Sequence, residues 1–395
     1  MQLVFFMMVL YQMIILGASI LISQNLGANK TKEAQNAALG CIVLSCTFAV
    51  FLSVVIFLLS ENIIGLYSLE INVHGFALEY LRIFSAGSIF TALSMTLGTI
   101  LRSYGYSREP MIVNTIAMVI SVIGNYIFIF GPFGIPVLGV KGVALSTVFS
   151  QFIACIIFII IIKKKRNIQL PFHGFRNVNK SVYRQILSVG VPTAGEHLSF
   201  NLAQIVIMGM YASLGTEVMA ATVYTITLLR FVFLTSMSIG NAAQIKVGYF
   251  VGAGLTSEAK QKVYRYFFIG FSVSLFMAVL VMLFRVPLIN IFTQNVNIHE
   301  LAYIIFMVSI LQESGRAFNI ILIPSLKGAG DVRFPVYMGI IFMWSTGVLP
   351  AYIFGFTLGW GLLGIRLAQA LDEWVRGIIM LMRWRNGRWQ TKSLV

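Results

Sequence analysis

Charged residues are scarce in this chain of 395 residues: they make up 10% of it, and only two of them, Asp331 and Asp372, are aspartates. No stretch has the spacing of a phosphate-binding loop, a zinc protease site, a nucleophile elbow or a Cys-x-x-Cys pair. The three cysteines, Cys41, Cys46 and Cys155, stand in apolar runs and are predicted to pack rather than to bind metal. We therefore expect neither an enzyme nor an ATP-driven pump, and no cofactor.

Hydrophobic residues are abundant instead, at 58% of the chain. They form continuous runs of about 20 residues, long enough to cross a hydrocarbon core of about 30 Å as a helix. The predicted fold class is therefore an all-α polytopic membrane protein. We place eleven spans, at residues 1–24, 35–60, 75–101, 110–131, 141–162, 182–213, 217–243, 260–285, 299–326, 333–354 and 361–383.

Positive charge is in excess, with 28 Lys and Arg against 13 Asp and Glu and a net charge of +15. Its distribution argues against a nucleic-acid partner, because 22 of the 28 basic residues lie in or beside every second connection between spans. Such connections mark the cytoplasmic side of a membrane protein. The basic segment Arg376–Lys392 therefore predicts a cytoplasmic C-terminus, and membrane lipids are expected around the spans.

Two separate segments occur twice with the same spacing. LRSYGYSREP returns as LKGAGDVRFP, and GANKTKEA returns as GAGLTSEA, each 225 residues later. One common spacing at two unlinked places indicates a tandem duplication. We expect two pseudo-symmetric helical bundles, an N-terminal lobe at residues 1–174 and a C-terminal lobe at residues 175–395.

The span at 182–213 has no partner 225 residues earlier, because that position precedes Met1. The first lobe would then have five spans and the second lobe six. One interpretation is a twelve-helix protein whose first helix is missing from this sequence. The other is a natural eleven-helix chain, which leaves one helix without its repeat partner.

A large duplication with both copies in one membrane orientation is typical of carriers. Other segments add a family resemblance: YLRI at Tyr80–Ile83, NYIFIFG with Asn125 and Gly131, GIPVLGVKGVALST, and VGVPTAGEHLSFNLAQ. Together with the repeated segments, in this order, they resemble the multidrug and toxic compound extrusion (MATE) family. The resemblance implies two six-helix bundles that export organic, often cationic, compounds in exchange for Na⁺ or H⁺.

Glu196 is the leading candidate for a coupling carboxylate. It follows Arg184 by twelve residues, which is about 18 Å along a helix and close to mid-membrane. Pro192, four residues earlier, lets the helix bend so that freed carbonyls face a cavity. A carboxylate there can bind Na⁺, exchange a proton or attract a cationic substrate. The alternative is a fixed ion pair with Arg230 on the next helix or with the adjacent His197.

Further polar residues inside the spans are secondary candidates. Glu313 and Arg316 are three residues apart and share a helix face, so we expect them to pair, either lining a cavity or as a permanent internal ion pair. The family resemblance makes Asn125 a cavity or cation-site residue, whereas the alternative is an interhelical hydrogen bond. His197 is a candidate site residue or a helix-packing residue. The cluster ALDEWVRG is expected to form a structural network.

These residues predict a cation-coupled secondary exporter of amphipathic organic cations, a monomer of the plasma (inner) membrane that works by alternating access. Two alternatives stay open. A lipid-linked saccharide flippase has a related architecture, and Arg230 and Arg316 would hold its pyrophosphate. An inactive truncated protein is the other, since the resemblance implies an acidic residue in the helix that the sequence lacks.

Overall fold

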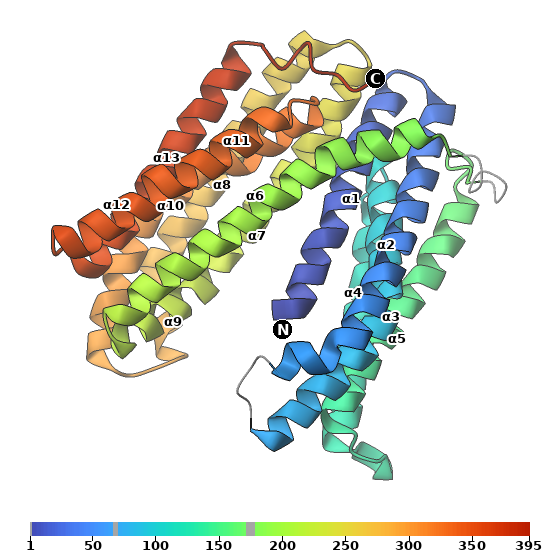
Figure 1. Cartoon of the computed structure of the whole chain (residues 1–395). Coiled ribbons are helices and arrows are strands. Elements are labelled where there is room, and N and C mark those ends of the chain that lie inside the picture. Colours follow the sequence, from blue (N-terminus) through green and yellow to red (C-terminus); the bar gives the residue numbers. More distant parts are fainter. Residues whose placement is uncertain (1, 66–69, 171–177) are drawn as a thin grey trace. The chain divides into compact units, whose positions relative to one another are not determined.

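The computed structural model describes residues 2–65, 70–170 and 178–395 (Figure 1). Every regular element within these ranges is helical, which confirms the predicted all-α class. The α-helices are α1 (Gln2–Gly27), α2 (Thr31–Gly65), α3 (Ile71–Ser103), α4 (Arg108–Phe130), α5 (Gly139–Lys164), α6 (Lys180–Ser213), α7 (Thr216–Gly252), α8 (Thr256–Leu283), α9 (Arg285–Asn290), α10 (Val296–Gly328), α11 (Arg333–Phe342), α12 (Leu349–Tyr352) and α13 (Gly361–Arg385). A short 3₁₀ turn, η1 (Pro132–Gly134), precedes α5, and two π-helical segments, η3 (Met343–Val348) and η4 (Ile353–Thr357), flank α12.

Nine helical stretches in the described ranges are long and apolar enough to cross a membrane. They coincide with nine of the eleven predicted spans. The other two predicted spans, 182–213 and 361–383, form α6 and α13, which are helical but are not among the nine. Polar and charged side chains lower the hydropathy of these two helices, and each of the eleven predicted spans is helical within the described ranges.

The helix ends repeat with the spacing seen in the sequence. Both α1 and α7 end at a glycine, Gly27 and Gly252, and α3 and α10 end at Ser103 and Gly328. The starts of α2 and α8, of α3 and α10, and of α4 and α11 are each 225 residues apart as well. The duplication inferred from short sequence matches is therefore a duplication of helices.

Backbone conformation follows the repeat at two positions that need a left-handed residue. Asn29 has a φ of 58°, and its repeat partner Gly254 has a φ of 74°. Gly105 and Gly330, at the turns after α3 and α10, have φ values of 86° and 95°. Glycine and asparagine enter this region at low cost, which explains why the turn sequences are recognisable in both copies.

The helices form two compact units. The first comprises the chain through Leu26 and residues Lys30–Gly190, and the second comprises Gly27–Asn29 and Val191–Val395. The division falls inside α6, one residue before Pro192. The lobe boundary predicted near residue 175 lies outside the described residues and stays a prediction.

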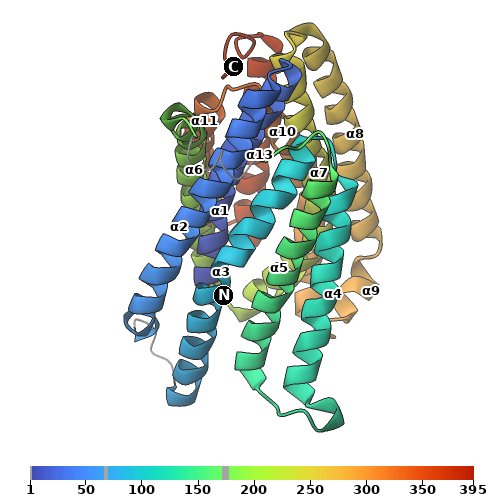
Figure 2. The same cartoon turned by 90° about the vertical axis from the view of Figure 1, so that its right-hand side faces the viewer.

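In the first unit, α3 packs against α2, α4 and α5 (Figure 2). The Tyr11 hydroxyl of α1 donates to Ser88 Oγ of α3 over 3.1 Å. The cysteines are free thiols, and Cys41 and Cys155 are buried, as expected of packing residues. This unit also contains Asn125, on α4.

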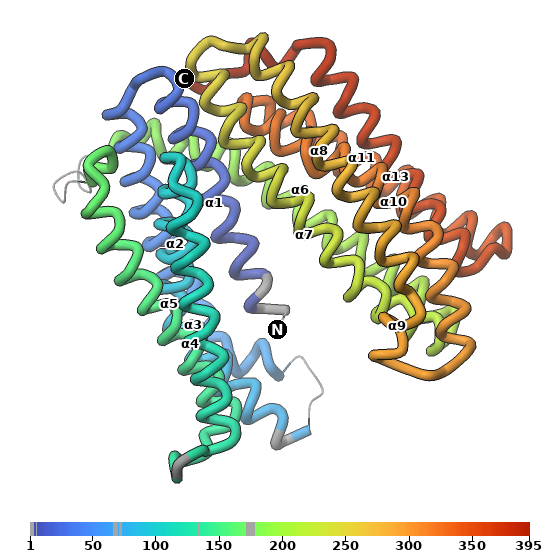
Figure 3. Tube along the Cα trace, turned by 180° about the vertical axis from the view of Figure 1, so that it is seen from behind, coloured from blue at the N-terminus to red at the C-terminus, as the bar shows by residue number. Residues whose placement is uncertain are grey.

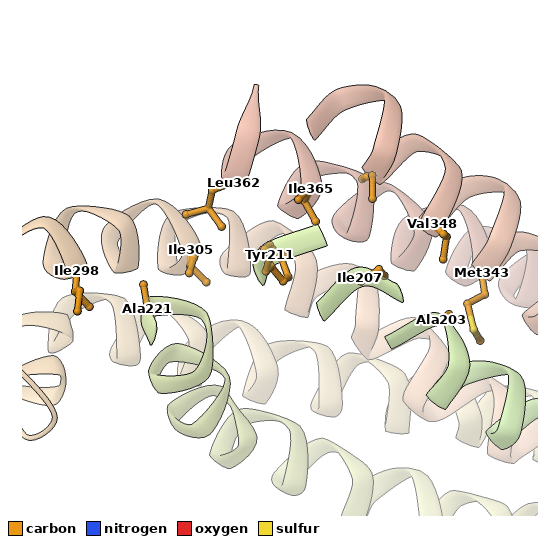
Figure 4. Close-up of a cluster of buried hydrophobic side chains, with 12 residues drawn as sticks. Ala203, Ile207, Tyr211, Ala221, Ile298, Ile305, Met343, Val348, Leu362 and Ile365 are labelled. Atoms are coloured by element: carbon orange, nitrogen blue, oxygen red, sulfur yellow. The ribbon is translucent and has the colours of Figure 1, made fainter. Parts of the chain in front are cut away.

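In the second unit, α10 is the central helix and packs against α7, α8 and α13 (Figure 3). A cluster of apolar side chains joins α6, α7, α10 and α13 to the π-helical segments η3 and η4. In Figure 4, Tyr211 of α6 lies between Ile305 of α10 and Ile365 of α13. Most of the buried charged residues of the unit lie on two helices of this group, α10 and α13.

Candidate functional site

Two helices of the second unit, α10 and α13, hold most of its buried charge. Later residues of α10 contact later residues of α13, so the two helices run in the same direction: Ile305 clusters with Ile365, and Arg316 bonds Glu373. Charges along one helix can therefore meet charges along the other. An ionised side chain inside a membrane is costly unless it is paired, and the pairs found here account for most of these charges.

Arg316 joins two carboxylates. Its Nη1 is 2.5 Å from Glu313 Oε1, and its Nε is 2.9 Å from Glu373 Oε1. The predicted pairing of Glu313 with Arg316 is therefore present, with a second carboxylate from α13 that the sequence analysis did not assign to it. Asn319 adds a hydrogen bond from Nδ2 to Glu373 Oε2 over 2.8 Å. Glu373 thus accepts hydrogen bonds from two side chains of α10.

Arg376 continues the network along α13. It donates from Nε and Nη2 to the two oxygens of Asp372, at 2.9 Å and 2.6 Å, and its Nη2 is 3.4 Å from Glu373 Oε2. Thr346, in the π-helical segment η3, donates to Asp372 Oδ1 over 3.0 Å. Segments of π-helix often occur at functional sites, and here one supplies a side chain to a buried carboxylate. The predicted network around ALDEWVRG is therefore present.

Glu196 forms an ion pair that the sequence analysis missed. Its Oε2 is 2.6 Å from Lys327 Nζ, and both side chains are largely buried, at 14% and 7% exposed. The expected alternative partners, Arg230 and His197, do not form this pair. Lys327 is the last residue but one of α10, so Glu196 lies near that end of α10. The mid-membrane depth of Glu196 stays a prediction.

The other oxygen of Glu196 faces a glycine. A β-carbon built on Gly339 of α11 would lie 3.1 Å from Glu196 Oε1. The absence of a side chain at Gly339 leaves room for the carboxylate between α6 and α11. Three helices therefore position this group: α6 carries it, α10 supplies its cation, and α11 gives it space.

The remaining predicted site residues are separate from these ion pairs. His197 and Arg230 are exposed, and Arg230 has no ion-pair partner within the described ranges. Asn125 belongs to the first unit, and its buried Oδ1 has no hydrogen-bond partner among the described residues. No group of three or more His, Cys, Asp or Glu side chains in the described part of the chain is arranged to hold a metal ion.

Arg366 is a buried charge that the sequence analysis overlooked. It is 3% exposed, near the start of α13, and its Nη1 is 3.4 Å from Gln369 Oε1. Its guanidinium carbon lies 5.2 Å from the ring centre of Tyr211. Its Nε and Nη2 have no hydrogen-bond partner among the described residues. An arginine inside a predicted span was the signal that could have identified it.

Sequence comparisons with known proteins match most or all of this chain. A family model described as MatE matches residues 1–127 and 192–353. A relative named "Uncharacterized transporter YisQ" from Bacillus subtilis (strain 168) is 35% identical over 393 residues, a match that covers 100% of this chain and 86% of the relative. A "Probable multidrug resistance protein NorM" from Thermotoga maritima is 26% identical, covering 96% of this chain and 82% of that protein.

Solved structures show the same fold. A crystal structure of MATE in the bent conformation superposes with a TM-score of 0.91 at 18% identity, covering 100% of this chain and 87% of that one. An outward-facing multidrug resistance MATE family transporter of the MOP superfamily superposes with a TM-score of 0.90 at 19% identity, covering 97% and 85%. Family and fold are those of a transporter and not of a known enzyme class. The chain is an integral membrane protein of the MATE family of transporters.

Proposed function

We propose that this transporter is a cation-coupled antiporter that exports amphipathic organic cations, with Glu196 as its coupling carboxylate. The observation that carries the proposal is the largely buried ion pair of Glu196 with Lys327. Lysine presents a compact ammonium on a flexible stem. Another cation can therefore compete with this ammonium for the carboxylate.

The proposed coupling follows from competition at one carboxylate. When Glu196 takes up a proton or binds Na⁺, Lys327 loses its partner and must find another or reach water, because an unpaired buried charge is unfavourable. The arrival of the coupling cation is thereby linked to a rearrangement near the end of α10. A ligand shifts a conformational equilibrium only through such a difference in binding between two states.

The wider assignment rests on the relatives. NorM proteins carry the name of probable multidrug resistance proteins, which supports small organic compounds as substrates and export by alternating access. We further propose that the protein acts as a monomer in the plasma (inner) membrane with a cytoplasmic C-terminus. It would have lipids as neighbours, no nucleic-acid partner and no cofactor beyond the coupling ion, Na⁺ or H⁺.

Transport of ethidium, an aromatic organic cation, by reconstituted protein tests this proposal. An imposed Na⁺ or H⁺ gradient should drive transport by the wild type, and Glu196→Gln should lower the gradient-dependent rate by about tenfold or more. Glu258→Gln, on an exposed carboxylate at the start of α8, is the matched control and should transport normally. Undiminished gradient-driven transport by Glu196→Gln would exclude Glu196 as the coupling group, and wild-type transport that ignores both gradients would exclude coupling.

The flippase alternative receives less support. Of the two arginines expected to hold its pyrophosphate, Arg316 is already paired with Glu313 and Glu373. Arg230 is exposed. A protein of similar fold, a MOP superfamily transporter from Pyrococcus furiosus, is described as having a binding pocket of reverse polarity, which suggests a different function for it. Binding of a lipid pyrophosphate to the purified protein tests the flippase alternative directly.

A further inference from the structure

Arg366 differs from Arg316 of α10 and Arg376 of α13 because two of its nitrogen donors, Nε and Nη2, have no hydrogen-bond partner among the described residues. Arg316 and Arg376 each contact two carboxylates. Arg366 makes no ion pair within the described ranges, although it is the most buried of the three. A buried donor without a partner is unfavourable, and more so when it is charged.

The guanidinium of Arg366 is nevertheless fixed in place. Its Nη1 reaches Gln369 Oε1, and that oxygen also accepts a hydrogen bond from the Tyr211 hydroxyl over 2.8 Å. Its plane lies near the Tyr211 ring, in a cation–π contact. Tyr211 is itself held in the apolar cluster of α6, α10 and α13 (Figure 4). Two contacts therefore orient the guanidinium, with Gln369 and with the Tyr211 ring, and they leave its Nε and Nη2 edge without a partner.

The unused edge is the one that binds carboxylates. Nε and Nη2 of arginine point the same way and can donate two parallel hydrogen bonds to the two oxygens of a carboxylate. Arg376 does this on the same helix, where its Nε and Nη2 hold the two oxygens of Asp372. In Arg366 the same two nitrogens are the ones that lack partners.

We propose that the Nε and Nη2 edge of Arg366 is a binding site for the carboxylate of a small organic anion or zwitterion. Gln369 and Tyr211 position the arginine, and the carboxylate supplies the two acceptors that the protein does not. The site is distinct from Glu196, which pairs with Lys327, and its existence does not depend on cation-coupled transport. It would extend the ligands of this protein from cations to compounds that carry a carboxylate.

Binding of salicylate, a fluorescent aromatic carboxylate, to the purified full-length protein in detergent tests the site. We expect saturable binding to the wild type and none by salicylamide, its neutral analogue. Arg366→Lys keeps the positive charge but removes the two parallel N–H donors of Nε and Nη2. It should weaken salicylate binding by about tenfold or more. Acetate as a competitor separates two sources of the carboxylate: comparable affinity points to a small free anion, and much weaker affinity points to an organic compound that carries it.

A second variant keeps the test decisive if Arg366 substitutions fold poorly. Gln369→Glu places a carboxylate where Gln369 Oε1 already contacts Arg366. It should raise the thermal unfolding temperature without ligand and abolish salicylate binding. Arg285→Gln is the matched control, because Arg285 also lies over a tyrosine ring, that of Tyr303, at 4.9 Å, and it should bind salicylate as the wild type does.

Three results would overturn the proposal. One is salicylate binding that is unchanged in Gln369→Glu and in Arg366→Lys. Another is equal binding of salicylamide, which has no charge to match the arginine. The third is effective displacement of salicylate by chloride, since a halide does not use the paired donors.

Discussion

Arg316 of α10 and Glu373 of α13 are equally far, in residues, from the ends of their helices at Gly328 and Arg385, and their side chains meet over 2.9 Å. Two parallel helices of the second unit thus bring opposite charges to the same level. Glu373 is the junction of the network, because it accepts from Arg316 and Asn319 and lies beside Arg376.

Glu373→Gln tests whether this junction holds the unit together. The substitution leaves Arg316 and Arg376 with one carboxylate each, and it weakens hydrogen bonds to a charged group that contribute about 1.5 to 3 kcal/mol each. We expect a clear fall in the thermal unfolding temperature of the detergent-solubilised protein. Glu300→Gln, on an exposed glutamate of α10, serves as the control and should unfold like the wild type. Equal unfolding temperatures for the two variants would contradict a structural role for Glu373.

Gly339→Ala tests the space around the coupling carboxylate. The new methyl group would lie 3.1 Å from Glu196 Oε1, closer than ordinary van der Waals contact, and would push the carboxylate from its position beside Lys327. We expect the coupling-cation concentration for half-maximal transport to rise by about 3- to 10-fold. Gly209→Ala, where a β-carbon meets no atom within 4 Å, is the comparison on α6. If both variants show the same cation dependence, the packing of Gly339 on Glu196 does not matter for coupling.

The sequence alone predicted those features that depend on residues close together in the chain or on the repeated segments. The Glu313–Arg316 pair follows from a spacing of three residues in one helix, and the duplication follows from turn sequences that need the same backbone twice. The pairing of Glu196 with Lys327 could not be predicted in this way, because these residues are 131 apart and meet only through the packing of α6 on α10. Lys327, directly after the predicted span 299–326, is one of the 22 basic residues in or beside the connections that predict the cytoplasmic side.

The paired turns after α3 and α10 give a prediction about stability. Gly105 and Gly330 both have positive φ, so alanine at either position costs about 1 to 2 kcal/mol of backbone energy. A β-carbon on Gly330 would also collide with the Lys392 carbonyl oxygen, whereas one on Gly105 meets no atom within 4 Å. Gly330→Ala should therefore lower the unfolding temperature more than Gly105→Ala. The reverse order would show that the C-terminal tail does not pack on the turn after α10.

Removal of Lys327 separates a structural from a competitive role for its ammonium. Lys327→Met leaves the Glu196 carboxylate without its partner, so this variant should be less stable than the wild type in a medium that contains only bulky organic cations. Na⁺ that binds the freed carboxylate should restore the stability, because a ligand at 100 times its dissociation constant contributes about 2.7 kcal/mol. The wild type should show a much smaller response to Na⁺, since Lys327 already occupies the carboxylate. The double variant Glu196→Gln with Lys327→Met removes both charges and should recover stability without responding to Na⁺. A Lys327→Met protein that is indifferent to Na⁺ but stabilised by acid would instead identify the proton as the competitor of the lysine.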